Sequence, residues 1–248
     1  MLKTERHLRI LHELNLHNRV LSAVLCGDMN VSEDTIRRDL QELSTQGKLL
    51  KVHGGAILPH PNGNGTVHKP YAQKEKSIIA QKAIKLIKEG SFVLTSGGST
   101  IIELAKALPQ ELRATFMSGS IPAINEYLKH ENLDVIVLGD KLNKSAKLTV
   151  GADVIHRLKT VEADICFLGI NAIHPEKGVT DNDWEVVQVK QQMIKSAKQI
   201  ICLTISEKLN TVQPIKVVAS QAIDILITEL DPEDSRLRPY RDSGILVL

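Results

Sequence analysis

Residues 31–43 read VSEDTIRRDLQEL, and this segment predicts an amphipathic helix with a defined start. Ser32 is a residue type that caps helix N-termini, because its side-chain oxygen accepts a hydrogen bond from a backbone N–H of the first turn. Glu33 and Asp34 would then lie at the positive end of the helix dipole, where acidic side chains are favoured. We therefore expect a helix that begins just after Ser32.

The same segment separates an apolar face from a polar one. Three aliphatic residues recur at helical spacing and would pack inward, which turns Thr35, Arg37 and Arg38 toward other faces. Arginine can grip guanine or phosphate through two hydrogen bonds, so such a helix can read DNA. The alternative is a solvated surface helix whose arginines pair with Glu33, Asp34 or Glu42. The inward residues are Ile36, Leu40 and Leu43.

The flanking sequence predicts two more helices and a wing. Leucines at helical spacing after Thr4, a candidate N-cap, indicate a first helix from about Glu5 to Leu16. Apolar residues from Leu21 to Leu25 predict a shorter second helix, which residues 27–30 would break. Two short strand-like runs between residues 48 and 57 surround Gly54-Gly55, a tight turn that needs positive φ. The order helix-helix-helix-wing predicts a winged helix-turn-helix domain over residues 1–57.

The chain changes character after residue 57. Residues 58–65 combine prolines, glycines and asparagines, which disfavour helix and sheet alike, so residues 58–70 are assigned to a linker. From residue 71 to 248, helices alternate with short apolar runs, a pattern typical of a mostly parallel sheet covered on both faces. We expect a Rossmann-like α/β domain there. Its apolar runs are residues 91–95, 114–117, 134–138, 164–168, 199–205 and 224–228.

Composition limits the function classes. The formal net charge is +2 over 248 residues, and the first 56 residues hold eight basic against seven acidic side chains, so one protomer would bind DNA weakly. Cys26, Cys166 and Cys202 are widely spaced among apolar residues, which indicates reduced thiols in place of disulfides or metal ligands. No signal peptide or membrane span is evident. We expect a cytoplasmic protein without cofactor or metal.

A second motif carries chemistry in the α/β domain. An apolar strand is followed by Ser96-Gly97-Gly98-Ser99-Thr100 and then by a helical pattern. Backbone N–H groups at such a turn, with the two hydroxyls and the helix dipole, can cradle a phosphate. An ordinary tight turn fits the glycine pair equally well.

The N-terminal motifs resemble the DeoR family of bacterial transcriptional regulators. The matching residues are Arg6, Ile10-Leu11, Val31-Ser32, Thr35-Ile36-Arg37-Arg38-Asp39-Leu40, Leu43, Gly47 and His53-Gly54-Gly55-Ala56. The resemblance implies that the third helix enters the major groove of double-stranded operator DNA, that the wing touches flanking DNA, and that a homo-oligomer, dimer or tetramer, reads repeated half-sites. The expected DNA-binding residues are Arg19, Ser32, Glu33, Asp34, Thr35, Arg37, Arg38, Lys51 and His53.

The C-terminal region resembles the sugar-phosphate isomerase-like sensor domain of the same family, with matches that include Val150-Gly151, Gly178-Val179-Thr180 and Ser206-Glu207-Lys208. This implies a small phosphorylated metabolite at the carboxyl ends of the strands. Lys208 would supply positive charge, or it is a solvated loop lysine. Asp181 and Asp183 would bind sugar hydroxyls, or they cap the next helix. The expected effector-binding residues are Ser96, Gly97, Gly98, Ser99, Thr100, Ser118, Gly119, Ser120, Gly169, Asn171, Asp181 and Lys208.

Three positions depart from the family pattern. The family commonly has an acidic residue where Thr95 stands, an asparagine near Gly119 and an aspartate near Ile205. The related isomerases also place carboxylates just after the strand at residues 164–168, whereas residues 168–174 hold none here, and His174 is a loop histidine before a proline. We therefore expect no catalytic residues and a regulator, most simply a repressor. The alternatives are an active sugar-phosphate isomerase with an appended domain, and a protein-interaction module.

Overall fold

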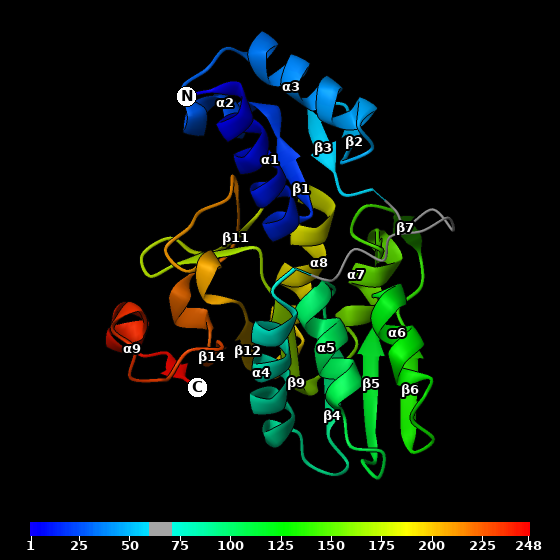
Figure 1. Ribbon diagram of the computed structural model, residues 1–248. Coiled ribbons are helices and arrows are strands. Elements are labelled where there is room, and N and C mark those ends of the chain that lie inside the picture. The colour runs from blue at the N-terminus through cyan, green and yellow to red at the C-terminus, as the bar shows by residue number, and fades with distance from the viewer. Residues whose placement is uncertain (60–70) are drawn as a thin grey trace. The chain divides into compact units, whose positions relative to one another are not determined.

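The chain divides into two compact units, Met1–Tyr71 and Ala72–Leu248. The computed structural model describes residues 1–59 and 71–248. The expected linker, residues 58–70, thus lies mostly outside the described residues. Figure 1 shows the elements of each unit along the chain. Within the described residues, no helix is long and apolar enough to cross a membrane.

The first unit is a winged helix-turn-helix fold. Three antiparallel strands form its small sheet in the order β1-β3-β2. Its core is built from aliphatic side chains of all three helices, among them Ile10, Leu14 and Leu25, which are at most 2 % exposed. The elements are α1 (Lys3–His17), β1 (Arg19–Leu21), α2 (Ser22–Met29), α3 (Glu33–Thr45), β2 (Leu50–Val52) and β3 (Gly55–Ile57).

The expected boundaries of two helices were wrong. Leu2, and not Thr4, is the N-cap of α1, because the Glu5 carboxylate accepts a hydrogen bond from the Leu2 backbone N–H at 2.9 Å. The helix α2 starts after Leu21, which pairs with β3, and runs through Gly27 to Met29. The strand β1 was not predicted, since three residues between two helices give too short a pattern.

The two glycines of the wing serve different purposes. Gly54 has φ of 75°, as the expected tight turn requires. Gly55 does not have positive φ, so the expectation was wrong for this residue. A side chain there would collide with the carbonyl of Val20, which means that Gly55 permits the close pairing of β1 and β3.

The second unit is built on a seven-stranded sheet in which every neighbouring pair is parallel. The strand order β15-β14-β12-β9-β4-β5-β6 confirms the expected mostly parallel α/β domain. The strands are β4 (Phe92–Thr95), β5 (Ala114–Ser118), β6 (Leu133–Val137), β9 (Ala163–Gly169), β12 (Ala197–Leu203), β14 (Ile225–Ile227) and β15 (Leu246–Val247).

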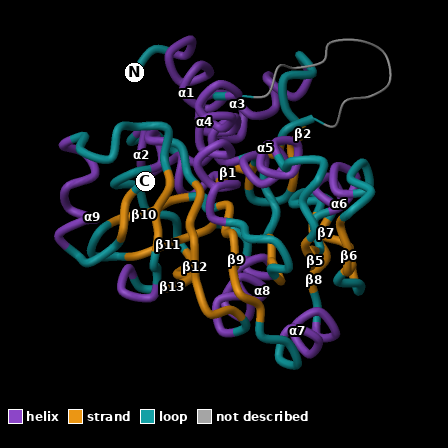
Figure 2. The backbone as a smooth tube through the Cα atoms, turned by 90° about the horizontal axis from the view of Figure 1, so that it is seen from below, coloured by secondary structure: helices purple, strands orange, loops and turns teal. Residues whose placement is uncertain are grey.

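Helices cover both faces of this sheet, as Figure 2 shows. One face carries α4 (Gln73–Ala83), α5 (Ser99–Ala107) and α6 (Ile121–Tyr127), and the other carries α7 (Ala152–Leu158) and α8 (Trp184–Lys195). The remaining helix, α9 (Arg238–Asp242), follows near the C-terminus. Four short 3-10 helices complete the set: η1 (Ile84–Leu86), η2 (Ser206–Lys208), η3 (Ser220–Ala222) and η4 (Ser235–Leu237).

Six further strands were not predicted: β15 at the edge of the main sheet, and five strands outside that sheet. A hairpin joins β7 (Lys141–Asn143) and β8 (Leu148–Val150), and a small antiparallel sheet joins β10 (Ala172–His174), β11 (Gly178–Asp181) and β13 (Ile215–Val218). These six strands are two to four residues long, so periodicity alone cannot find them.

The thiols of Cys166 and Cys202 are free and buried in the main core.

Candidate functional site

The N-terminus of α3 has the cap that the sequence predicts. The Ser32 hydroxyl oxygen accepts a hydrogen bond from the Thr35 backbone N–H at 3.3 Å and lies 2.9 Å from the Thr35 hydroxyl. Glu33 and Asp34 follow in the exposed first turn. The start of α3 is thereby fixed by residues 32–35.

The two faces of α3 are arranged as expected. Ile36, Leu40 and Leu43 are at most 1 % exposed, whereas Arg37 and Arg38 are exposed. Arg37 Nη2 lies 3.2 Å from a carboxylate oxygen of Asp34, one of its expected partners. Both side chains of that pair are about 70 % exposed, so the pair is weak and a phosphate can replace Asp34 as the partner of Arg37.

The wing presents two further polar side chains. Lys51 and His53 are both exposed, and the Lys51 ammonium donates a hydrogen bond to the Gln41 side chain at 3.1 Å, which ties β2 to α3. Arg19 lies on β1 and is half-buried. The structure thus leaves four expected cationic or imidazole groups exposed: Arg37, Arg38, Lys51 and His53.

In the second unit, the carboxyl ends of β4 and β9 meet in one loop cluster. The Ser96 backbone N–H donates to the Phe167 carbonyl at 3.1 Å, and the Ser96 hydroxyl accepts from the Gly169 N–H at 2.9 Å. A side chain at Gly169 would come within 2.6 Å of the Gly97 carbonyl oxygen. Gly169 therefore allows these two loops to touch.

The carboxyl end of β5 lies beside this cluster. The Ser118 hydroxyl donates to the Thr95 carbonyl at 3.0 Å and accepts from the Ser120 N–H at 3.2 Å. A side chain at Gly119 would collide with the Thr149 hydroxyl, so this position has no room for one in the present packing. These hydroxyls hold the loops in place.

The expected phosphate-binding turn leads into α5. Gly98 has φ of 112° and precedes Ser99, the first residue of the helix, and no side chain in the described part of the chain caps this N-terminus. Thr100 is buried and Ser99 is half-buried. The first-turn N–H groups of α5 therefore have no side-chain acceptor, which is the arrangement that suits an anion.

Lys208 is not a solvated loop lysine, so that interpretation of it was wrong. The side chain is half-buried, and its ammonium nitrogen donates to the Ile170 carbonyl at 3.1 Å. Burial, together with the charges of Lys76 and Lys190, lowers the pKa of Lys208 to about 7, although the charges of Asp181 and Glu207 oppose the shift. Lys208 is thus a half-buried amine whose charged form is disfavoured by its surroundings.

Asp181 is engaged by its neighbours. It is 4 % exposed, and its carboxylate lies 2.7 Å from the Lys190 ammonium and accepts from the Asn171 side chain at 3.1 Å. Burial alone would raise the pKa of Asp181, but the charge and hydrogen bond of Lys190 outweigh it and lower that pKa. Asp183 caps α8 by accepting from Glu185 and Val186, so its expected alternative role, a helix cap, is the one observed.

Two residues of this region were missed as site candidates. Lys76 on α4 and Lys190 on α8 are each 5 % exposed, and both act on the pKa of Lys208. Each lies on the apolar face of its helix. Lys76 shares that face with Ile79 and Ala83, and Lys190 shares it with Met193. A lysine at such a position is rarely buried without a partner, and this signal was available in the sequence.

The other departures from the family pattern also have structural counterparts. Thr95 is fully buried, and its hydroxyl accepts from the Tyr127 phenol at 3.0 Å. Ile205 is 2 % exposed and brings no carboxylate to the loop of Lys208. The loop after β9 holds no acid, and His174 Nδ1 accepts from the Glu176 N–H in a local turn. No group of residues within 1–59 and 71–248 could hold a metal ion.

Comparison with known proteins gives matches over both units. Residues 6–62 match the DeoR-like helix-turn-helix domain, and residues 71–230 match the DeoR C terminal sensor domain. The HTH-type transcriptional repressor GlcR of Bacillus subtilis (strain 168) is 32% identical over 244 residues, which cover 95% of this chain and 92% of that protein. The glycerol-3-phosphate regulon repressor of Escherichia coli (strain K12) is 26% identical over 99% of this chain and 98% of its own length.

Proposed function

Because the chain belongs to the DeoR family of transcriptional regulators, we propose that it represses transcription by placing α3 in the major groove of operator DNA. A small phosphorylated metabolite controls this binding from the carboxyl ends of β4, β5, β9 and β12. The chain acts as a regulator and not as an enzyme, and we assign it to the cytoplasm.

The DNA-binding half of the proposal is carried by the division of α3 into two faces. Its buried aliphatic residues fix the helix in the first unit, and Arg37 and Arg38 remain exposed. Recognition helices use this arrangement, with phosphate contacts that set the register and base contacts that give the sequence preference. Lys51 and His53 on the wing supply contacts to flanking DNA.

The effector-binding half is supported by the charges around Lys208. The charges of Lys76 and Lys190 both act on Lys208, and one buried carboxylate, Asp181, pairs with Lys190. The uncapped N-terminus of α5 adds N–H donors at the ends of neighbouring strands. An anion with several oxygens, such as a phosphate ester, is the ligand that this donor set favours.

A homo-oligomer, dimer or tetramer, completes the proposal. The near-balanced charge of the first 56 residues gives one protomer few net phosphate contacts. Two linked domains on repeated half-sites raise the effective concentration of the second and so compensate for weak single contacts.

The test is selection of sequences from a random duplex library by the full-length protein, followed by affinity measurements at several salt concentrations. We expect a selected repeat and an affinity that falls steeply with salt. Absence of any selected sequence would refute the DNA-binding assignment. A thermal-shift screen with phosphorylated sugars tests the effector site, since a ligand of the native state raises the apparent stability, and Lys208→Met should abolish the response.

A further inference from the structure

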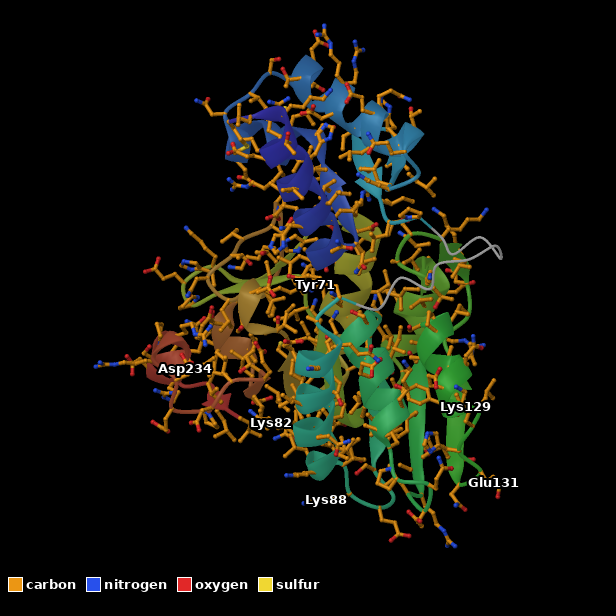
Figure 3. All side chains as sticks on the ribbon, in the orientation of Figure 1. Tyr71, Lys82, Lys88, Lys129, Glu131 and Asp234 are labelled. Carbon is orange, nitrogen blue, oxygen red and sulfur yellow. The ribbon has the colours of Figure 1, made fainter. Side chains whose placement is uncertain are left out.

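Lys82 on α4 is bound to the chain segment that follows β14. Its ammonium group donates hydrogen bonds to the carbonyls of Thr228 and Leu230, at 2.9 and 2.6 Å. The side chain is half-buried, and Figure 3 shows it on the side of α4 next to β14. Charge-assisted hydrogen bonds of this kind are stronger than neutral ones, so α4 is firmly attached to residues 228–230.

Glu229 lies between those two carbonyls and binds the next loop. Both of its carboxylate oxygens accept from the Ser206 backbone N–H, at 3.1 and 2.9 Å. Ser206 is the first residue of η2, and Lys208 is the last. We call the chain of contacts from Lys82 through residues 228–230 to Ser206 the α4–η2 clasp.

A second connection joins the same two elements nearer the start of α4. Lys76 lies six residues before Lys82 and is 5 % exposed. Its charge lowers the pKa of Lys208. Burial lowers the pKa of Lys76 itself, and the charge of Glu207 in η2 is among those that oppose this shift. Both ends of η2 therefore act on α4, one through hydrogen bonds and the other through charge.

We infer that the α4–η2 clasp makes Lys82 and Glu229 positioning residues that transmit occupancy of the effector site to α4. This inference rests on the proposed function, since it takes the site around Lys208 as the place where an anion binds. When an anion binds the Lys208 ammonium, η2 shifts with that residue. Because the clasp connects η2 to α4 by hydrogen bonds, α4 shifts as well. In sequence, α4 is the first described helix after residues 58–70, and so the helix of the second unit nearest in the chain to the DNA-binding unit.

Hydrogen–deuterium exchange of the full-length protein, with sodium sulfate as the probe and sodium chloride at equal ionic strength as the reference, tests the inference. In the wild-type protein, sulfate should slow exchange in peptides covering residues 206–209 and in those covering 73–86. In Lys82→Met, the protection of residues 206–209 should persist, while the protection of α4 should fall to less than a third of its wild-type value. Lys82→Arg should retain both effects, because arginine can still donate to the two carbonyls.

Lys85→Met is the matched control, since Lys85 is an exposed lysine three residues further along, and it should behave as the wild type does. Glu229→Ala cuts the clasp at its other end and should give the same loss as Lys82→Met, which covers the case in which one variant fails to fold. Undiminished α4 protection in both variants would overturn the clasp. If wild-type residues 206–209 show no protection, the proposed effector site is wrong and the inference falls with it.

Discussion

The guanidinium of Arg6 on α1 is bound to the carboxylate of Asp39 on α3, with Nε 2.7 Å from one oxygen and Nη2 3.1 Å from the other. His7 approaches the same carboxylate at 3.1 Å, and Asp39 is 2 % exposed. The hydrogen bond to Asp39 raises the pKa of Arg6. These two residues therefore hold α1 against α3, while the neighbouring Arg37 and Arg38 remain exposed.

Asp39→Asn should destabilise the DNA-binding unit markedly, because it leaves the partly buried Arg6 without its charge partner. Loss of one member of a buried ion pair costs about 3 kcal/mol, to be measured by urea denaturation. Glu42→Gln is the control, since its pair with Lys3 is roughly half exposed and exposed pairs contribute less than about 1 kcal/mol. Equal stability of the two variants would contradict a structural role for Asp39.

Arg38→Ala should weaken binding to the selected operator by roughly 5- to 150-fold, as expected for about 1–3 kcal/mol per bidentate base contact. Fluorescence anisotropy with labelled duplex gives the affinity. Arg113→Ala removes an exposed arginine of the second unit and should leave the affinity within about twofold. If the two variants bind equally well, α3 does not read the operator through Arg38.

Asp34→Asn should strengthen DNA binding at low salt. The substitution removes a negative charge from α3, the helix proposed to enter the major groove, and releases Arg37 from its exposed pair. The gain is expected to be modest, about two- to fivefold, because exposed pairs are worth less than about 1 kcal/mol. An unchanged affinity across salt concentrations would show that Asp34 does not compete with phosphate for Arg37.

Sulfate binding to the second unit should strengthen as the pH falls through about 7, the pKa to which burial and the nearby lysines lower Lys208. Below that pH the ammonium is charged and can bind the anion, whose own charge does not change in this range. The groups around it are Lys76, Lys190, Asp181 and Glu207. Isothermal titration calorimetry between pH 6 and 8 should show this trend in the wild type and a flat profile in Lys208→Met.

The stability of the protein should respond to pH in the opposite sense. A lysine whose folded-state pKa lies below its unfolded value binds more protons when unfolded, so its contribution to stability falls as the pH drops from about 10 to 7. Lys208→Met should therefore gain melting temperature relative to the wild type as the pH is lowered across that window. A constant difference between the two proteins would contradict the lowered pKa of Lys208.

Gly119→Ala should destabilise the second unit, because the new side chain would overlap the Thr149 hydroxyl. Overpacking of this kind costs about 1–3 kcal/mol. Thr149→Ala removes that hydroxyl, so the double variant should recover much of the loss. A double-mutant cycle by thermal denaturation measures the coupling, and strict additivity would rule out the contact as the reason for glycine at this position.

Much of the DNA-binding unit could be predicted from sequence because α3 carries its signals locally: a cap at Ser32 and apolar residues at helical spacing. The parallel sheet was equally predictable from its apolar runs. The short strands β7, β8, β10, β11 and β13 and the edge strand β15 were not, since their stability comes from tertiary pairing and not from a local pattern. The surroundings of Lys208 depend on residues up to 132 positions apart in the chain, from Lys76 to Lys208, and only the fold brings them together.

Trp184 is the only tryptophan in the chain. It is 64 % exposed and opens α8 directly after the Asp183 cap, three residues beyond Asp181. Indole emission responds to nearby charge and solvent, so the protein contains its own optical reporter beside the charged network. Titrations of unlabelled protein can thus be followed in a fluorimeter, with excitation that selects the indole over the three tyrosines, so that the signal reports one known position.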